Sequence, residues 1–460
     1  MNQPLSNSQT RDAEALLHTY VNPVALRRTG VQTIERGEGI RVFDQAGRPF
    51  IEAMSGLWCA GLGFGNSELA EAARIQMEKL PYYHLFGGKS HEPAVELAER
   101  IKALTPGRMS RVIFQSSGSE ANETQVKLAW YYNNARGRPE KKKIISRVRG
   151  YHGVTIVAGS LTGLPYNHRD FDLPVDRILH ADTPHHWKGG EPGESEPDYA
   201  ARLAVALEDL ILGEGPDTVA AFIAEPVMGA GGVIIPPEGY FPAIAEVCRR
   251  HDILMIADEV ICGFGRTGQW FGSQTFGYEP DTISMAKQLT GGFLPLSAVA
   301  VNADIAETVE THAAEIGTFG HGFTYGGHPV AAAVGIRALD IYERDDIPGH
   351  VRAVAPRFAA HIDRLAAHPL VGEGRRMGLL GAFELAPDRS PKGFTTPGKV
   401  GPRLADELLA RGVIGRALGD TLALCPPMII TEAEIDELFA PFEAALDATH
   451  AWAKSEGHIA

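Results

Sequence analysis

Short apolar runs recur along this chain, and helix-length stretches separate each run from the next. The runs occupy residues 111–114, 143–146, 220–224, 253–257 and 282–285. Continuous runs of this length are typical of strands that are buried on both faces. Strands that alternate with helices favour a mostly parallel sheet with helices on both of its faces. The pattern therefore predicts an α/β fold.

The two ends of the chain follow different patterns. Residues 1 to about 35 are expected to form an arm with a helical turn around residues 13–20, and two alternating segments within residues 39–52 predict a hairpin around an Asp-to-Gly turn. After about residue 330, an Ala-rich helix is expected to lead into a second α+β unit that includes residues 379–385.

Composition excludes several classes of function. The chain has 460 residues, of which 44% are hydrophobic, and its formal net charge of -14 argues against nucleic acid or an anionic membrane surface as a partner. No apolar stretch reaches the roughly 20 residues that span a bilayer. The first residues are polar, and four scattered cysteines form no CxxC pair, so we expect a cytoplasmic protein. His185 and His186 have no third ligand nearby, and we predict no metal site.

One lysine and one aspartate end two of the apolar runs. Lys287 follows the run at 282–285 and precedes Gly291 and Gly292, whereas Asp258 follows the run at 253–257. Chemistry in a parallel sheet collects beyond the carboxyl ends of the strands. A lysine amine there can form an imine with an aldehyde, and a carboxylate can keep a pyridine nitrogen protonated. This pair predicts a pyridoxal-phosphate enzyme.

A third strand end is suited to binding phosphate. Residues 116–123 follow the run at 111–114 and open a helix, and Gly118 lets the backbone approach an anion closely. The hydroxyls of Ser117 and Ser119 and the free N–H groups of the helix can then bind phosphate. A serine cap on an ordinary helix is the alternative. The presence of Lys287 and Asp258 favours the phosphate interpretation.

Three further residues at strand ends are candidates for the site. Tyr151 can stack on a flat cofactor or be a buried turn residue, and His152 can hydrogen-bond Asp258. Glu225 can steer the lysine or the substrate, or it can cap a buried loop.

Six motifs occur in one order along the chain: SSGSEANE (116–123), GYHG (150–153), AEPVMGAGG (224–232), IADEVICGFGRTG (256–268), SMAKQLTGG (284–292) and HGFTYGGHPVAAA (321–333). Together they resemble the class III pyridoxal-phosphate aminotransferases, from about residue 31 to residue 430. The resemblance implies fold type I, with a mostly parallel large domain and a smaller α+β domain. We expect an arm and part of the small domain over residues 1–60, the large domain over 61–330 and the rest of the small domain over 331–460.

The resemblance also implies roles for individual residues. Lys287 forms the Schiff base and moves the proton, and Asp258 pairs with the pyridine nitrogen. The other expected cofactor contacts are Ser117, Gly118, Ser119, Tyr151, His152, Glu225, Val260, Phe323 and Thr324. Thr324 is expected to reach the phosphate of a neighbouring subunit, which implies a homodimer with shared active sites and leaves a tetramer open. A helix-capping threonine is the alternative for Thr324.

Substrate specificity is expected to depend on a second group of residues. Arg416 lies in a Gly-flanked segment where a guanidinium can clamp a keto-acid carboxylate, although a solvent-facing arginine is the alternative. The expected pocket wall consists of Leu57, Trp58, Phe86, Tyr151 and Ala230. Trp58 is equally suited to filling the core. Such a wall would suit an apolar or aromatic amine.

The resemblance is nearest to the omega-transaminase branch, which includes the amine:pyruvate and omega-amino acid:pyruvate enzymes. It implies transfer of an amino group from a primary amine or omega-amino acid to a keto acid such as pyruvate. The cofactor would be pyridoxal 5'-phosphate, and pyridoxamine 5'-phosphate between the two half-reactions. A 4-aminobutyrate or ornithine aminotransferase and a dialkylglycine-type decarboxylase are the alternatives within the fold. A cofactor-sensing regulator would need a DNA-binding segment, for which the N-terminal arm is too short.

Overall fold

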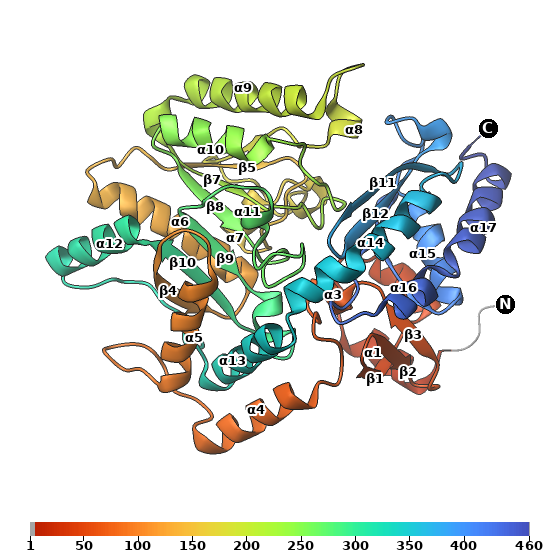
Figure 1. Ribbon diagram of the computed structural model, residues 1–460, viewed down its shortest axis with the longest axis horizontal. Coiled ribbons are helices and arrows are strands. Elements are labelled where there is room, and N and C mark those ends of the chain that lie inside the picture. The colour runs from red at the N-terminus through yellow and green to blue at the C-terminus, as the bar shows by residue number, and fades with distance from the viewer. Residues whose placement is uncertain (1–4, 460) are drawn as a thin grey trace.

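A seven-stranded sheet forms the centre of the computed structural model, which describes residues 5–459 (Figure 1). Its strand order is β4-β10-β9-β8-β7-β5-β6. The strands are β4 (Met109–Gln115), β5 (Lys143–Arg147), β6 (Ile178–Ala181), β7 (Val219–Ala224), β8 (Leu254–Asp258), β9 (Thr282–Met285) and β10 (Ser297–Asn302). All pairs from β9 to β6 are parallel, whereas β10 is antiparallel to both β4 and β9. The predicted mostly parallel sheet is confirmed.

Both faces of this sheet are covered. All six residues of β7 are buried, and because successive side chains of a strand point to opposite faces, each face must be packed against other elements. The helices of this region are α4 (Ser67–Lys79), α5 (Glu92–Leu104), α6 (Gly118–Ala135), α7 (Ile156–Leu161), α8 (His186–Gly189), α9 (Glu196–Glu214), α10 (Tyr240–Arg250), α11 (Gly272–Thr275), α12 (Ala303–Ile316) and α13 (Pro329–Arg344). Short 3-10 helices lie at η1 (Pro165–Asn167), η2 (Pro216–Thr218) and η3 (Lys287–Thr290).

Segments from both ends of the chain meet beside the large sheet (Figure 1). The predicted hairpin is confirmed as β2 (Arg41–Asp44) and β3 (Pro49–Glu52), which extend β1 (Ile34–Glu38). The outer edge of β3 pairs in parallel with β13 (Val413–Ile414). The expected domain boundaries at residues 60 and 330 stay a prediction.

A second small sheet has the order β11-β12-β15-β14. Its strands are β11 (Val371–Met377), β12 (Leu380–Leu385), β14 (Arg416–Leu418) and β15 (Thr421–Leu424). The remaining elements are α3 (Ser55–Trp58), α14 (Ile347–Leu365), η4 (Pro387–Arg389), α15 (Val400–Ala410), α16 (Glu432–Phe439) and α17 (Phe442–Ser455).

The N-terminal arm differs from its prediction. The helix α1 spans Asn7–Ala15 rather than residues 13–20, and a second helix α2 spans Pro23–Thr29. Ser6 and Gln9 form a reciprocal capping box that fixes the start of α1, and Asn22 caps α2. The backbone between them is not helical. None of the helices between residues 5 and 459 is long and apolar enough to cross a membrane.

Candidate active site

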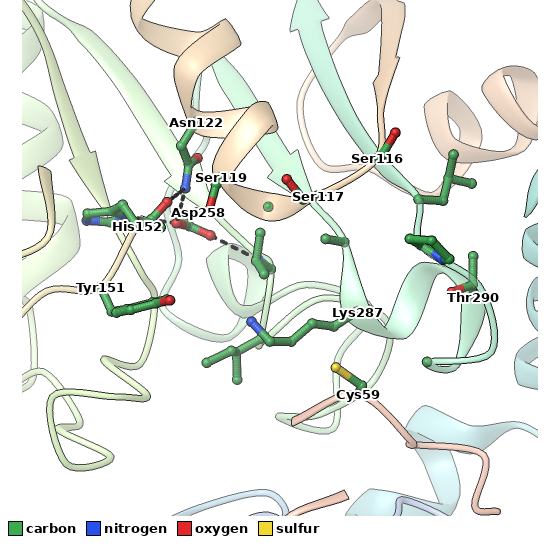
Figure 2. Close-up of a pocket in the computed structure, with 18 of the residues that line it drawn as sticks. Cys59, Ser116, Ser117, Ser119, Asn122, Tyr151, His152, Asp258, Lys287 and Thr290 are labelled. Atoms are coloured by element: carbon green, nitrogen blue, oxygen red, sulfur yellow. Dashed lines mark hydrogen bonds and ion pairs between the residues drawn. The ribbon is translucent and has the colours of Figure 1, made fainter. Parts of the chain in front are cut away.

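A cavity of about 410 Å³ opens beyond the carboxyl ends of β5, β7, β8 and β9 (Figure 2). Nine of the predicted cofactor-binding residues line it, although they come from distant parts of the chain: Ser117, Gly118, Ser119, Tyr151, His152, Glu225, Asp258, Val260 and Lys287. The sheet topology brings them together, because each one ends a strand, follows the end of a strand or begins the helix after it. The volume lies within the range of roughly 300–1,000 Å³ that is usual for small-molecule sites.

Lys287 lies two residues beyond the end of β9 and begins η3. Its φ angle of 41° lies in the left-handed region, which is unfavourable for a residue with a β-carbon and recurs at functional sites. Gln288 anchors the same turn, since its Nε2 donates to the Trp58 carbonyl at 2.9 Å and its Oε1 accepts from the Gly61 N–H at 3.1 Å. The Lys287 amine has no hydrogen bond or ion pair within the described part of the chain, so it is available to a ligand.

Asp258 is the last residue of β8, and its side chain is only 3% exposed. Its Oδ2 accepts hydrogen bonds from Asn122 Nδ2 and from His152 Nδ1, each at 2.7 Å, and its Oδ1 accepts from the Val260 N–H at 3.1 Å. The predicted contact between His152 and Asp258 is confirmed (Figure 2). Three donors thus fix the orientation of a buried carboxylate.

Asn122 was not predicted as a site residue, although a signal was present. It follows Ser119 by three positions in α6, and residues three apart share one face of a helix. Asn122 Nδ2 also donates to the His152 carbonyl oxygen at 2.7 Å. The side-chain amide of Asn122 therefore connects α6 both to the loop at His152 and to the carboxylate of Asp258.

The serine cluster, defined by Ser117, Gly118 and Ser119, confirms the helix-cap interpretation, and phosphate binding stays a prediction that its geometry allows. Ser117 is the N-cap of α6 and its Oγ accepts from the Glu120 N–H at 3.2 Å, while Ser119 Oγ accepts from the Val154 N–H at 3.1 Å. Each hydroxyl still has its hydrogen to donate to an anion. At Gly118 a β-carbon would lie 3.3 Å from Val260, so glycine keeps this part of the cavity open.

The donor set fits pyridoxal phosphate. The N-terminus of an 18-residue helix with two serine hydroxyls is suited to a phosphate, and the buried carboxylate of Asp258 is suited to a protonated ring nitrogen. The side chains of Val260 and Tyr151 add apolar surface for a flat ring, and the amine of Lys287 lines the same cavity.

The carboxylate of Glu225 accepts a hydrogen bond from the backbone of Tyr151. Glu225 is buried and accepts from the N–H groups of Tyr151 and Gly229, each at 2.9 Å, so it fixes the loop that follows β7. Burial raises the pKa of Glu225. Burial, followed by the neighbouring Tyr20, raises the pKa of Tyr151. Tyr20 comes from the N-terminal arm, and no sequence motif indicated that it lies here.

The predicted substrate residues other than Tyr151 lie outside the 410 Å³ cavity. Ala230 and Arg416 line a neighbouring cavity of about 1350 Å³. Trp58 is 3% exposed and packs in an apolar cluster with Met54 and Ile261, whereas Leu57 is 55% exposed and Phe86 is 46% exposed.

Two predicted cofactor residues also lie outside this cavity. Thr324 is exposed and Phe323 is partly exposed, both in the loop that precedes α13. Phe86 lies beside this loop, because a β-carbon at Gly322 would meet its ring at 2.8 Å.

Comparison with known proteins agrees with this geometry. The model of the family "Aminotransferase class-III" matches residues 25–446. Gamma-aminobutyrate transaminase 1 of Oryza sativa subsp. indica is 47% identical over 418 residues, which cover 90% of this chain and 81% of that protein. An uncharacterized aminotransferase of Sinorhizobium fredii is 46% identical over 443 residues and 95% of each chain.

A solved structure is similar over nearly the whole chain. The omega transaminase from Pseudomonas jessenii in complex with PMP has 50% sequence identity and a TM-score of 0.96, covering 97% of this chain and 99% of that one. A family match over most of the sequence, a shared fold and a cavity that joins Lys287, Asp258 and the serine cluster lead to one conclusion. The chain belongs to the class III aminotransferases, which use pyridoxal phosphate.

Proposed function

We propose that this aminotransferase moves an amino group from a primary amine or omega-amino acid to a keto acid such as pyruvate. The observation that carries the proposal is the position of Arg416, which comes from β14 and lines the 1350 Å³ cavity together with Ala230 and apolar side chains such as Leu164. Arg416 has no carboxylate within 4.0 Å among residues 5–459. A free guanidinium in an apolar wall is suited to a keto-acid carboxylate, and the apolar surface to an uncharged amine substituent.

The residues of the smaller cavity would carry the chemistry. Bound pyridoxal phosphate supplies an aldehyde for the amino group and a ring that accepts an electron pair. Lys287 would hold the cofactor, and its Nζ would move the proton at the amine-bearing carbon of the substrate. Asp258 would keep the ring nitrogen protonated, with Asn122 and His152 fixing its carboxylate. Ser117, Ser119 and the N–H groups of α6 would bind the phosphate.

We also propose a homodimer with shared active sites. An exposed aromatic patch, defined by Tyr82, Tyr83, Phe86 and Tyr325, lies beside Thr324, and the Tyr82 hydroxyl donates to the Thr324 carbonyl at 2.9 Å. Exposed apolar clusters of this kind mark protein interfaces. In such a dimer, Thr324 and Phe86 would complete the site of the partner subunit.

Mixing inactive variants tests the shared site. If Lys287 of one subunit and Thr324 of the other serve the same site, K287A and T324D dimers are each inactive. Unfolding and refolding them together would form heterodimers, in which one of the two sites combines an intact Lys287 with an intact Thr324. Recovery of amine transfer is expected. A mixture that forms heterodimers, shown by differently tagged subunits, and stays inactive would contradict the shared site.

A 4-aminobutyrate aminotransferase is the second candidate, since a relative with 47% identity carries that name. Purified protein with bound cofactor should be incubated with 1-phenylethylamine, 4-aminobutyrate or ornithine, without a keto acid, while its visible absorption is followed. Loss of the yellow band with one enantiomer of 1-phenylethylamine supports the amine:pyruvate proposal. Loss only with 4-aminobutyrate or ornithine would replace it with the second candidate.

We propose a cytoplasmic location as well. The four cysteines are free, which fits a reducing compartment. Fractionation of the source cells tests this, and recovery of the protein in an organelle or outside the cell would contradict it.

A further inference from the structure

A second arginine lines the same cavity as Arg416. Arg149 follows β5, precedes Tyr151 by two residues and lines the 1350 Å³ cavity with Arg416 and Ala230. Neither of these arginines has a carboxylate within 4.0 Å among residues 5–459. The cavity is therefore bordered by two guanidinium groups that are both available to anions.

The backbone does not explain why arginine occupies this position. Arg149 has a φ angle of 69°, in the left-handed region where glycine and asparagine are favoured. The Arg149 N–H donates to the Gly163 carbonyl at 2.8 Å. The Arg149 carbonyl oxygen is packed against Gly231, where a β-carbon would lie only 2.4 Å from it. This local structure holds the unfavourable conformation in place. The long charged side chain at this position therefore calls for another explanation.

The charged side chains near Arg149 do not balance, because they include more cations than carboxylates. Arg375 contacts both Glu373 and Glu384, with its Nη2 2.8 Å from Glu384 Oε2, and Lys188 also contacts Glu384. Together with Arg149 these residues bring three cations to two carboxylates. Burial lowers the pKa of the adjacent His185, which favours its neutral form.

The excess charge faces the cavity. Glu384 is engaged by three donors, namely Arg375, Lys188 and the Thr421 hydroxyl at 2.7 Å. After burial, Glu384 and Arg375 have the largest effects on the pKa of Arg149. Neither Glu373 nor Glu384 forms an ion pair with Arg149. Burial also lowers the pKa of Arg149, yet a guanidinium stays charged at neutral pH. An anionic ligand in the cavity would neutralise this partly buried charge.

We propose that Arg149 is a second carboxylate-binding residue, so that a substrate with two carboxylates binds with one at Arg416 and the other at Arg149. The ligand class is a dicarboxylic keto acid or the corresponding amino dicarboxylic acid. The inference rests on the proposed function, since it extends the acceptor pocket around Arg416. It adds a specificity determinant, because a keto acid with one carboxylate can use only one of the two guanidinium groups.

Binding of unreactive acids tests this without turnover. Calorimetry on the protein with bound cofactor would compare succinate with butyrate, glutarate with pentanoate and adipate with hexanoate. Each pair differs by one carboxylate at constant chain length. At least one diacid should bind about ten- to a hundredfold more tightly than its monoacid, as expected for one added charge-assisted contact. The chain length with the largest ratio would report the separation of the two guanidinium groups.

The key variant is Arg149→Asn, because asparagine tolerates the left-handed backbone and the fold is retained. It should lose most of the preference for the diacid, and Arg149→Lys should keep part of it, since lysine retains the charge but not the bidentate geometry. Arg249→Asn is the matched control, because Arg249 is an exposed arginine of α10 that pairs with Glu246. It should leave the preference intact.

Two results would overturn the inference. One is the absence of any diacid preference in the unaltered protein, and the other is a preference that survives in Arg149→Asn. Neither result touches the proposed function, which depends on amine transfer to pyruvate measured on the same preparations. Conversely, a protein that transfers no amine to any keto acid yet shows an Arg149-dependent diacid preference would contradict the proposed function and retain the binding site.

Discussion

The site has two regions that are built differently, which we name the cavity floor and the outer wall. The cavity floor consists of Lys287, Asp258, Asn122 and His152, which lie at strand ends or on α6 and line one cavity. Within one chain Asp258 contacts both Asn122 and His152. The outer wall consists of four residues that we propose to contact the substrate or the partner's site: Leu57 in the one-turn helix α3, Phe86 and Thr324 on loops, and Arg416 on the short strand β14. Leu57 and Phe86 are about half exposed in the single chain.

Under the proposed function, this difference separates the residues that carry the chemistry from those that select the substrate. The cavity floor is fixed by a buried sheet, where a displaced side chain would disturb the packing of the core. The outer wall is carried by segments that can change without that penalty, which is where binding specificity commonly resides. Substitutions in the floor should therefore lower the rate with every substrate, whereas substitutions in the wall should change the ranking of substrates.

The largest effect is expected from K287A. Under the proposed function Lys287 both attaches the cofactor and carries a proton, so removing its amine should lower amine transfer by about 10⁴-fold with all substrates. Lys392→Ala, in an exposed loop, is the matched control and should keep its activity. Activity should be measured with several amines, together with visible absorption. Substantial amine transfer by K287A would refute the assignment of the floor.

The next effect is expected from R416A, and only with one class of substrate. A bidentate charged contact contributes about 1.5–3 kcal/mol, so kcat/KM for keto acids should fall roughly ten- to a hundredfold. Use of apolar amines should change much less. Separate measurement of the two half-reactions tests this, and equal losses in both would place Arg416 outside the wall.

A smaller effect is expected from N122A. Asn122 contacts Asp258 but provides only one of its three donors, so kcat should fall about tenfold while KM changes little. The loss should be the same for every amine tested. A loss that varied strongly between amines would show that floor and wall are not separate.

The smallest effect on activity is expected from E259Q. This variant instead tests the pH dependence of the free energy of unfolding, at the buried residue that follows Asp258 of the floor. Glu259 accepts from the N–H groups of Gly272 and Ser273, and burial raises its pKa from 4.5 to about 7. Because the folded protein then holds a proton that the unfolded chain has released, stability should fall as pH rises from about 4.5 to 7. Relative to the unaltered protein, E259Q should gain up to ~3 kcal/mol between pH 5 and pH 8. Denaturant unfolding at both pH values measures this, and parallel pH profiles would contradict it.

The sequence predicted the cavity floor far better than the outer wall. Strand ends carry a local signal, because an apolar run that stops at Asp258 or just before Lys287 marks both the strand and its chemistry. The missed strand β10 is built mostly from small residues and runs directly into α12, and the missed β6 is a short, partly exposed edge strand. Neither has a long β-branched run, so the pattern was weak.

The outer wall depends on contacts between segments that are distant in the sequence, and the spacing of hydrophobic residues does not reveal such contacts. Tyr20 comes from the segment between α1 and α2 and lies close to Tyr151, whereas the sequence predicts a helical turn over residues 13–20. Arg149 gave no signal either, since its neighbours in the charge cluster come from α8, β11 and β12.

The pairing of β3 with β13 has a consequence for biosynthesis. The N-terminal hairpin leaves the ribosome long before Val413 and Ile414, its partners across the outer edge of β3, have been made. At about 5–20 residues per second, this edge waits roughly 20–70 s for its partner strand. During that time it offers unpaired N–H and C=O groups to other nascent chains. The unpaired edge of β3, in the sheet β1-β2-β3-β13, is therefore a segment that a chaperone would cover during synthesis, although the proposed chemistry lies in the large sheet.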